Sequence, residues 1–185
     1  APVIAPYDPK EMIASYLPPS REHLLGTNDV GQDIFSEMVY GTRVSLYIGI
    51  FAAFIVTGVG TVLALVSGYF GGVTDKIITA ITNIAMAVPS LPLTVLLVAY
   101  LNPGKWSLII AISVTAWTGT ARILRSRVMQ LKELPFIKIE KTMGVHPVVI
   151  LFKHILPNIK DIILTRGAMA ISGAMMTEAG LSFLG

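Results

Sequence analysis

Residues 134–158 read LPFIKIEKTMGVHPVVILFKHILPN, and this polar-studded stretch separates two very hydrophobic regions of the chain. Pro135 suits the first turn of a helix, where its missing N–H is not needed. Phe136, Ile139 and Met143 lie three and four residues apart, so a helix places them on one side. The first half of the stretch therefore predicts a short amphipathic helix.

Gly144 divides the stretch into two helices. A glycine just past the last periodic residue supplies the left-handed backbone conformation that ends a helix without a Cβ penalty. Pro147 is placed to open a second helix, which we expect to end near Pro157. The same alternation of apolar and basic residues also suits an amphipathic hairpin that lies on a membrane surface.

The composition is that of an integral membrane protein. Of 185 residues, 54% are hydrophobic and only 14% are charged, and the mean hydropathy is +0.72. The arginines cluster at the end of an apolar span, not on a soluble basic face with aromatic readers, which argues against nucleic-acid binding. No cysteine is present, so disulfide and thiol chemistry are excluded.

The charges are segregated along the chain. Residues 1–43 hold three basic and six acidic residues, whereas residues 122–160 hold eight basic and two acidic ones. Cytoplasmic loops of membrane proteins carry an excess of Lys and Arg. We therefore expect an extracytoplasmic connector and interfacial helix in residues 1–43, and a cytoplasmic loop at residues 122–158.

Four membrane spans are predicted. Residues 44–70 contain no charge and are longer than the roughly 20 residues that cross the hydrocarbon core. The four spans cover about residues 44–70, 77–100, 106–121 and 159–179. Small residues four apart in the first span would let helices approach closely, although a plain lipid-facing helix is equally compatible with them: Gly49 with Ala53, and Ala64 with Gly68. Residues 44–185 are therefore predicted to form an all-α, polytopic transmembrane bundle.

The second span is interrupted by Pro89 and Pro92, and Asn83 lies in its first half. Proline removes a backbone hydrogen bond and predicts a kinked helix here. Neighbouring helices can simply tolerate such a kink. Broken helices with polar groups also line transport paths, and Asn83 would otherwise face lipid unpaired. We therefore assign Asn83, Pro89 and Pro92 to a candidate translocation path.

The fourth span carries Asp161 and Arg166 close to its start and Glu178 close to its end. Charges at the bilayer centre are costly, whereas charges near the ends of a span can reach the headgroups. We expect these three side chains to be snorkelling anchors and not a proton relay.

The 134–158 stretch also resembles a known loop. Permease subunits of binding-protein-dependent ABC importers carry a cytoplasmic loop with a glycine followed, ten residues on, by His-x-Leu-Pro, and Gly144, His154, Leu156 and Pro157 fall at that spacing. Residues 138–140, Lys-Ile-Glu, stand where the family usually has Glu-Ala-Ala. The glycine and the His-x-Leu-Pro part of the motif are retained.

Two further segments resemble the dipeptide and oligopeptide branch of that family, in its second-permease type. Residues 121–125 match its Ala-Arg-x-x-Arg pattern, and residues 25–46 match Leu-Gly-Thr, Gly-x-Asp, Ser, Tyr-Gly-x-Arg and Ser-Leu. Asn28 and Gln32 stand where this branch tends to have Asp and Arg, so the ion pair usually made there is not expected. The resemblance covers about residues 21–185.

The resemblance implies a type I permease-like bundle with a cytoplasmic coupling helix-turn-helix, importing a peptide, nickel or a related solute. The implied partners are a homologous permease subunit, two ATPase subunits that bind ATP and Mg, an extracytoplasmic solute-binding protein and membrane lipid. The residues implied to couple to the ATPases lie in or beside the loop: Phe136, Ile139, Glu140, Gly144, His154, Leu156 and Pro157.

No catalytic or metal site is predicted in this chain. There is no P-loop and no nucleophile motif, and His23, His146 and His154 lack ligand spacing, so we expect it to bind no cofactor. A secondary transporter would show inverted repeats and ion-coupling acids at midplane, which we do not find. A membrane scaffold without transport stays open. We expect the sequence to be a piece trimmed at both ends from a longer one.

Overall fold

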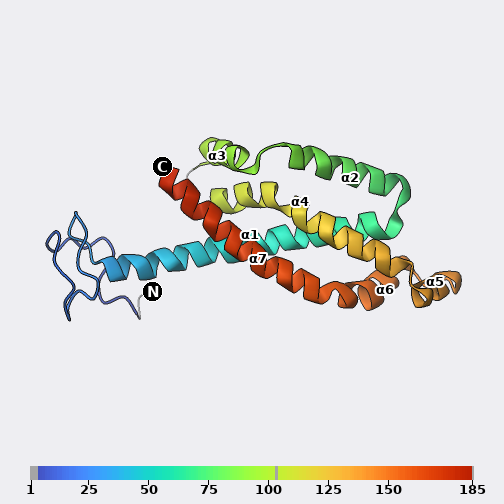
Figure 1. Cartoon of the computed structure of the whole chain (residues 1–185), viewed down its shortest axis with the longest axis horizontal. Helices are drawn as coiled ribbons and strands as arrows, with labels where there is room; N and C mark the ends of the chain where they lie inside the picture. The colour runs from blue at the N-terminus through green and yellow to red at the C-terminus, as the bar shows by residue number, and fades with distance from the viewer. Residues whose placement is uncertain (1–3, 103, 185) are drawn as a thin grey trace. The chain divides into compact units, whose positions relative to one another are not determined.

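The chain folds into helices in the computed structural model, which describes residues 4–102 and 104–184 (Figure 1). The described residues form no strand, and an isolated β-bridge joins Thr27 to Asp33. The predicted all-α class is therefore confirmed. The elements follow in the order α1 (Ile34–Phe70), α2 (Gly72–Ala87), α3 (Ser90–Tyr100), α4 (Lys105–Lys132), α5 (Pro135–Thr142), α6 (Pro147–Ile150), the π-helical turn η1 (Leu151–Ile155) and α7 (Leu156–Leu184).

The chain divides into two compact units, Ala1–Tyr47 and Ile48–Gly185. In the first unit, the described residues before α1 form turns and extended segments. Gly26 and Gly31 adopt φ angles of 77° and 83°, which only glycine accepts readily. Thr27 is buried, and its backbone N–H donates to Leu17 O at 3.1 Å. This bond joins two segments of the region before α1.

Asp33 starts α1. Its carboxylate accepts a hydrogen bond from Ser36 N at 2.8 Å, as a helix N-cap does, and lies 3.0 Å from His23 Nδ1. Burial raises the pKa of Asp33, but the hydrogen bonds from Ser36 and His23 outweigh burial, so the net shift of this pKa is downward. The short helix expected within residues 25–46 is in fact the first turns of α1, because no breaker separates them from the apolar run.

Two described helices, α1 and α4, are long and apolar enough to cross a membrane, and α2 with α3 makes a third if the pair is one broken span. The pair differs from the single kinked helix expected at residues 77–100. Its two halves are bent by 85°. Val88 takes the extended conformation that a following proline favours, and Pro89 then opens α3. The crossing predicted for residues 159–179, which lie within α7, stays a prediction.

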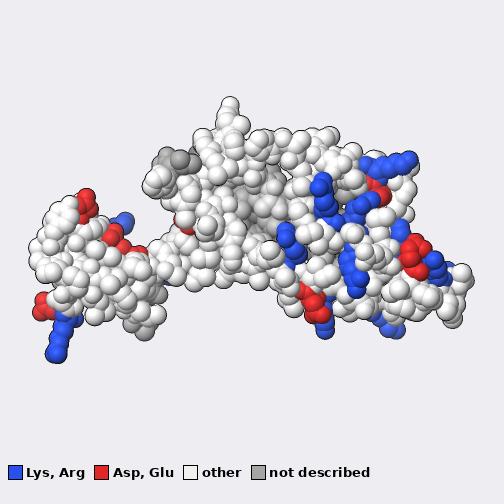
Figure 2. Space-filling view, viewed as in Figure 1, with Lys and Arg blue, Asp and Glu red and all other residues white. Residues whose placement is uncertain are grey.

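Lys and Arg side chains gather over one end of the second unit. On the face drawn in Figure 2 they lie over the second half of α4, the start of α7 and the short helices between them. The end of this unit near α3 shows almost none on the same face. This distribution is the one that the positive-inside rule associates with a cytoplasmic end.

In the second unit, α4 packs against α2, α3 and α7. Glycines of α1 permit close approach: a Cβ on Gly60 would lie 2.8 Å from Thr120 Cβ, and one on Gly68 would lie 2.8 Å from Val128 Cβ. A Cβ on Gly49 would lie 3.0 Å from Met175 in α7. The small residues of the first span thus serve helix packing within this chain.

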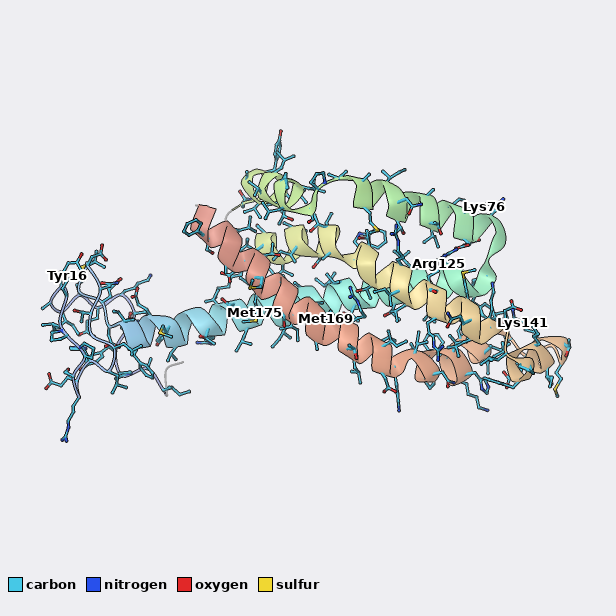
Figure 3. The ribbon with its side chains drawn as sticks, viewed as in Figure 1. Tyr16, Lys76, Arg125, Lys141, Met169 and Met175 are labelled. Atoms are coloured by element: carbon cyan, nitrogen blue, oxygen red, sulfur yellow. The ribbon has the colours of Figure 1, made fainter. Side chains whose placement is uncertain are left out.

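An ion pair joins three helices near the basic end (Figure 3). Arg125 of α4 donates from Nε and Nη2 to both carboxylate oxygens of Asp75 in α2, each at 2.5 Å. Ser67 of α1 donates to the same carboxylate and accepts from Arg125 Nε at 3.1 Å. The bidentate geometry and the shared hydroxyl fix the register of α1, α2 and α4 together.

Replacing Gly60 with alanine should destabilise the protein by about 1 to 3 kcal/mol, because the new methyl group overpacks the α1–α4 contact. Gly58→Ala is the matched control, since a Cβ there meets no heavy atom within 4 Å among the described residues. The denaturant midpoint of the purified full-length protein in detergent measures both effects. Equal midpoints for the two variants would contradict the packing assigned to Gly60.

Candidate functional site

The turn after α5 has the geometry of a Schellman motif. Gly144 has φ of 77°, its N–H donates to Lys141 O at 3.1 Å, and Val145 N donates to Glu140 O at 3.0 Å. These two bonds satisfy carbonyls that the end of a helix leaves unpaired. His146 then caps α6, because its Nδ1 accepts from Val148 N at 3.3 Å. The predicted helix, glycine turn and second helix are all present.

The two faces of α5 have different surroundings. Ile137 is 1% exposed and belongs to a core that α1, α4, α6, η1 and α7 build together. Phe136, Ile139 and Met143 are 43%, 57% and 75% exposed. We call these three side chains the α5 surface. Ile137 is the residue of α5 that is buried in this core, whereas the α5 surface is exposed and can contact another molecule or lipid.

Glu140 and His154 form a contact between α5 and η1. His154 Nε2 lies 2.8 Å from Glu140 Oε1, and the His154 ring lies 6.2 Å from the Phe136 ring, centroid to centroid. Both side chains are about one quarter exposed. This contact joins α5 to η1 across the turn. It brings together three of the predicted coupling residues: Phe136, Glu140 and His154.

The second predicted helix does not end near Pro157. Helices α6, η1 and α7 follow one another without a break, and Pro157 is the second residue of α7. The π-helical turn accounts for the difference, because Leu156 N donates to Leu151 O and this wider turn precedes the residue that lacks an N–H. Leu156 packs against the core that contains Ile137. The loop is therefore joined rigidly to α7.

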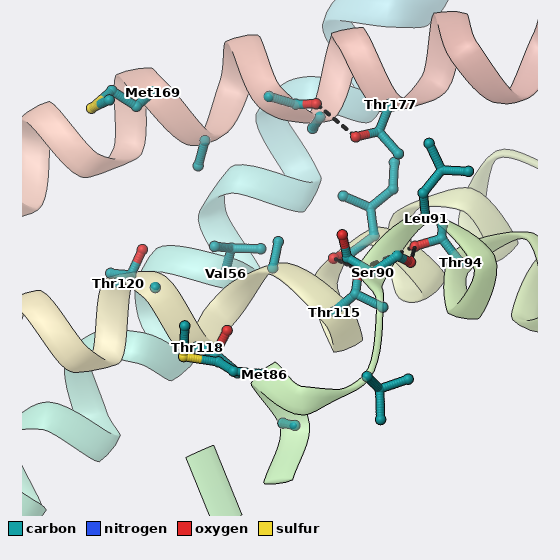
Figure 4. Close-up of a pocket in the computed structure, with 18 of the residues that line it drawn as sticks. Val56, Met86, Ser90, Leu91, Thr94, Thr115, Thr118, Thr120, Met169 and Thr177 are labelled. Carbon is teal, nitrogen blue, oxygen red and sulfur yellow. Dashed lines mark hydrogen bonds between the residues drawn. The ribbon is translucent and has the colours of Figure 1, made fainter. Parts of the chain in front are cut away.

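The three predicted path residues do not lie together. Asn83 is exposed and its side-chain oxygen accepts from Arg122 Nη2 at 2.9 Å, which supplies the polar partner that the sequence left unassigned. Pro89 lies at the bend and lines a cavity of about 610 Å³ between α1, the α2–α3 junction, α4 and α7 (Figure 4). Pro92 lies within the first turn of α3 and is not among the residues that line this cavity.

Sequence reasoning missed residues that the structure places at this cavity. Thr94 Oγ1 donates to Ser90 O at 2.7 Å and lies 3.2 Å from Thr115 Oγ1. These hydroxyl groups belong to residues that line the cavity. Arg166 lines the cavity beside Gly119, where a Cβ would lie 3.3 Å from Arg166 Nη2. The expectation that Arg166 snorkels toward headgroups stays a prediction. The sequence carries no signal for the contact with Gly119, because the two residues lie far apart along the chain.

The geometry and the sequence agree with one class of protein. Residues 60–185 match the family described as "Binding-protein-dependent transport system inner membrane component", and the chain belongs to this family. The family that the resemblance predicted is therefore confirmed, and the apolar helices of the chain agree with an integral inner-membrane component.

Relatives with assigned names lie in the peptide branch. The chain is 39% identical over its whole length to the oligopeptide transport system permease protein OppC of Bacillus subtilis (strain 168). It is 37% identical over 91% of its length to the dipeptide transport system permease protein DppC of the same organism, and 37% identical over 90% to the glutathione transport system permease protein GsiD of Pectobacterium atrosepticum. It spans 61%, 53% and 56% of these relatives.

Proposed function

We propose that this chain is part of the permease of an ATP-driven importer that translocates peptides delivered by an extracytoplasmic binding protein. Energy comes from two ATPase subunits that carry ATP and Mg, and a homologous permease subunit completes the path. The names of the relatives, which refer to oligopeptides, dipeptides and glutathione, support the substrate class.

The α5 surface is the observation that carries this proposal. Phe136, Ile139 and Met143 stand exposed on a helix whose opposite side is fixed by Ile137. An apolar helix face of this kind fits a hydrophobic groove on a partner. The Schellman turn at Gly144 and the Glu140–His154 contact hold that face rigidly on the end of α7. Movement of an ATPase subunit that binds α5 is thereby transmitted through α6 and η1 to α7.

The distribution of charges supports one direction of the chain in the membrane. We infer that residues 122–158 face the cytoplasm, where ATP is available, and that residues 1–43 are extracytoplasmic and able to meet a binding protein. The basic side chains near α5 support the first assignment and the acidic excess of residues 1–43 supports the second.

Three alternatives make different use of the same features. An interfacial hairpin would bury the α5 surface in lipid headgroups and need no ATPase. A secondary transporter would respond to an ion gradient, and a scaffold would transport nothing. The dependence of uptake on ATP separates all three from the proposal.

The complete permease should therefore take up a labelled tripeptide only when its partners and ATP are present. The experiment reconstitutes it with the homologous permease and the two ATPases in liposomes, and adds the binding protein. An ATPase variant that cannot hydrolyse ATP is the control. Uptake that persists with this variant, or that follows an imposed proton or sodium gradient, would contradict the proposal.

A further inference from the structure

The cavity between α1, the α2–α3 junction, α4 and α7 is lined by one arginine and several hydroxyl-bearing side chains (Figure 4). Its volume of about 610 Å³ is in the range of small-ligand sites. Arg166 is the one ionisable side chain among the described residues that line it. Hydroxyl groups supply the other polar side chains of the wall: Ser90, Thr94, Thr115, Thr118, Thr120 and Thr177.

Two polar atoms in this wall have no hydrogen-bond partner among the described residues. Nε of Arg166 is buried and unpartnered, and so is Oγ1 of Thr120, a residue that is 0% exposed. Both atoms are closed off from solvent, so a ligand in the cavity would reach Arg166 through Nη1 or Nη2 and not through Nε. Nη1 donates to Met169 Sδ at 4.0 Å, and this sulfur is a weak acceptor that a carboxylate oxygen would outcompete.

The start of α3 also borders this cavity. Ser90 and Leu91 are its first two residues, and both line the cavity. The first N–H groups of a helix have no acceptor within the helix and carry the positive end of its dipole. Pro89, at the N-cap position, makes no side-chain capping bond to them. Broken helices in transporters direct such N-termini at anionic groups of the substrate.

We infer that this cavity binds the C-terminal carboxylate of the peptide during translocation, with Arg166 as its principal partner. The inference rests on the proposed function. The terminal nitrogens of a guanidinium match the two oxygens of a carboxylate, and Arg166 is the one ionisable side chain among the described residues that line the cavity. The hydroxyl groups of the wall can donate further hydrogen bonds to the same carboxylate.

The test compares uptake of tri-alanine with uptake of tri-alanine amide by the complete reconstituted transporter. Arg166→Gln should lower uptake of the acid about tenfold and leave uptake of the amide unchanged, because charge-assisted bonds to the carboxylate are lost. Arg166→Lys should retain part of the preference for the acid. The binding protein is the same in every sample, so a change in the ratio of the two rates reports on the permease.

Arg127→Gln is the matched control, because Arg127 is an exposed arginine of α4 that does not line the cavity. Its ratio of acid to amide uptake should equal that of the unaltered protein. An equal loss of both probes in Arg166→Gln would assign Arg166 a structural role and overturn the inference. An unchanged ratio would overturn it as well. If the unaltered transporter takes up neither tripeptide, the proposed function fails together with the inference.

Discussion

Replacing Gly144 with valine is expected to lower ATP-driven uptake by the assembled transporter about 5- to 30-fold, while the permease stays in the membrane. Gly144 has φ of 77°, and the left-handed conformation costs a β-branched residue about 1 to 2 kcal/mol. A Cβ at this position meets no described heavy atom within 4 Å. The effect therefore comes from the backbone, which would leave the Schellman turn and release α5 from its docked orientation.

Two variants control this experiment. Gly144→Asn should keep most of the uptake, because asparagine tolerates the left-handed conformation better than other residues with a side chain. Lys153→Ala, at an exposed position of η1, should change little. The measurements are membrane abundance, ATPase activity stimulated by the binding protein, and uptake. Normal uptake in Gly144→Val would reject the coupling role and favour a hairpin that merely lies on the membrane surface.

The turn at Gly144 could be predicted from the sequence because its signals are local. A proline in the first turn, a glycine after the last apolar residue and a second proline each act within a few residues, and α5 and α6 start where those prolines stand. The apolar runs were equally clear, since α1 covers the whole uncharged stretch of residues 44–70.

Features that depend on tertiary contacts could not be predicted in the same way. Pro157 carries a strong stop signal, yet a π-helical turn lets the helix pass through it. Periodicity grouped Phe136, Ile139 and Met143 correctly on one side of α5, but only packing reveals that Ile137 is the buried residue. Burial in a short helix is decided by the helices around it, which sequence spacing does not report.

The polar groups of the spans were the hardest to assign, because their partners lie far away along the chain. Arg125 was predicted only as part of a basic cluster, whereas it pairs with Asp75, fifty residues earlier. The assignment of Asn83 to a transport path stays a prediction, but its polar partner could not be predicted: the side-chain oxygen accepts from Arg122 of α4. A basic residue at the end of a span can therefore face lipid headgroups or form an ion pair with a neighbouring helix. The pattern of charges in the sequence does not distinguish these two roles.

Removing the Asp75 carboxylate by Asp75→Ala is expected to destabilise the permease by about 3 kcal/mol, at the lower end of the range for breaking a buried ion pair. The side chains of Asp75 and Arg125 are 17% and 28% exposed, so the guanidinium left behind would be largely desolvated. Ser67 would also lose the carboxylate to which it donates. The denaturant midpoint of the purified full-length permease measures the loss.

The double variant Asp75→Ala/Arg125→Met separates the value of the pair from the penalty of an unpaired charge. It should be more stable than Asp75→Ala alone, because the apolar side chain needs no partner. Glu133→Ala is the matched control: its ion pair with Lys138 is 2.8 Å long, but both side chains are more than half exposed, so no measurable change is expected. If Asp75→Ala were as stable as Glu133→Ala, the interactions among Ser67, Asp75 and Arg125 would not be needed for stability. The register of α1, α2 and α4 would then rest on apolar packing and on the close approach of Gly60 and Gly68 to α4.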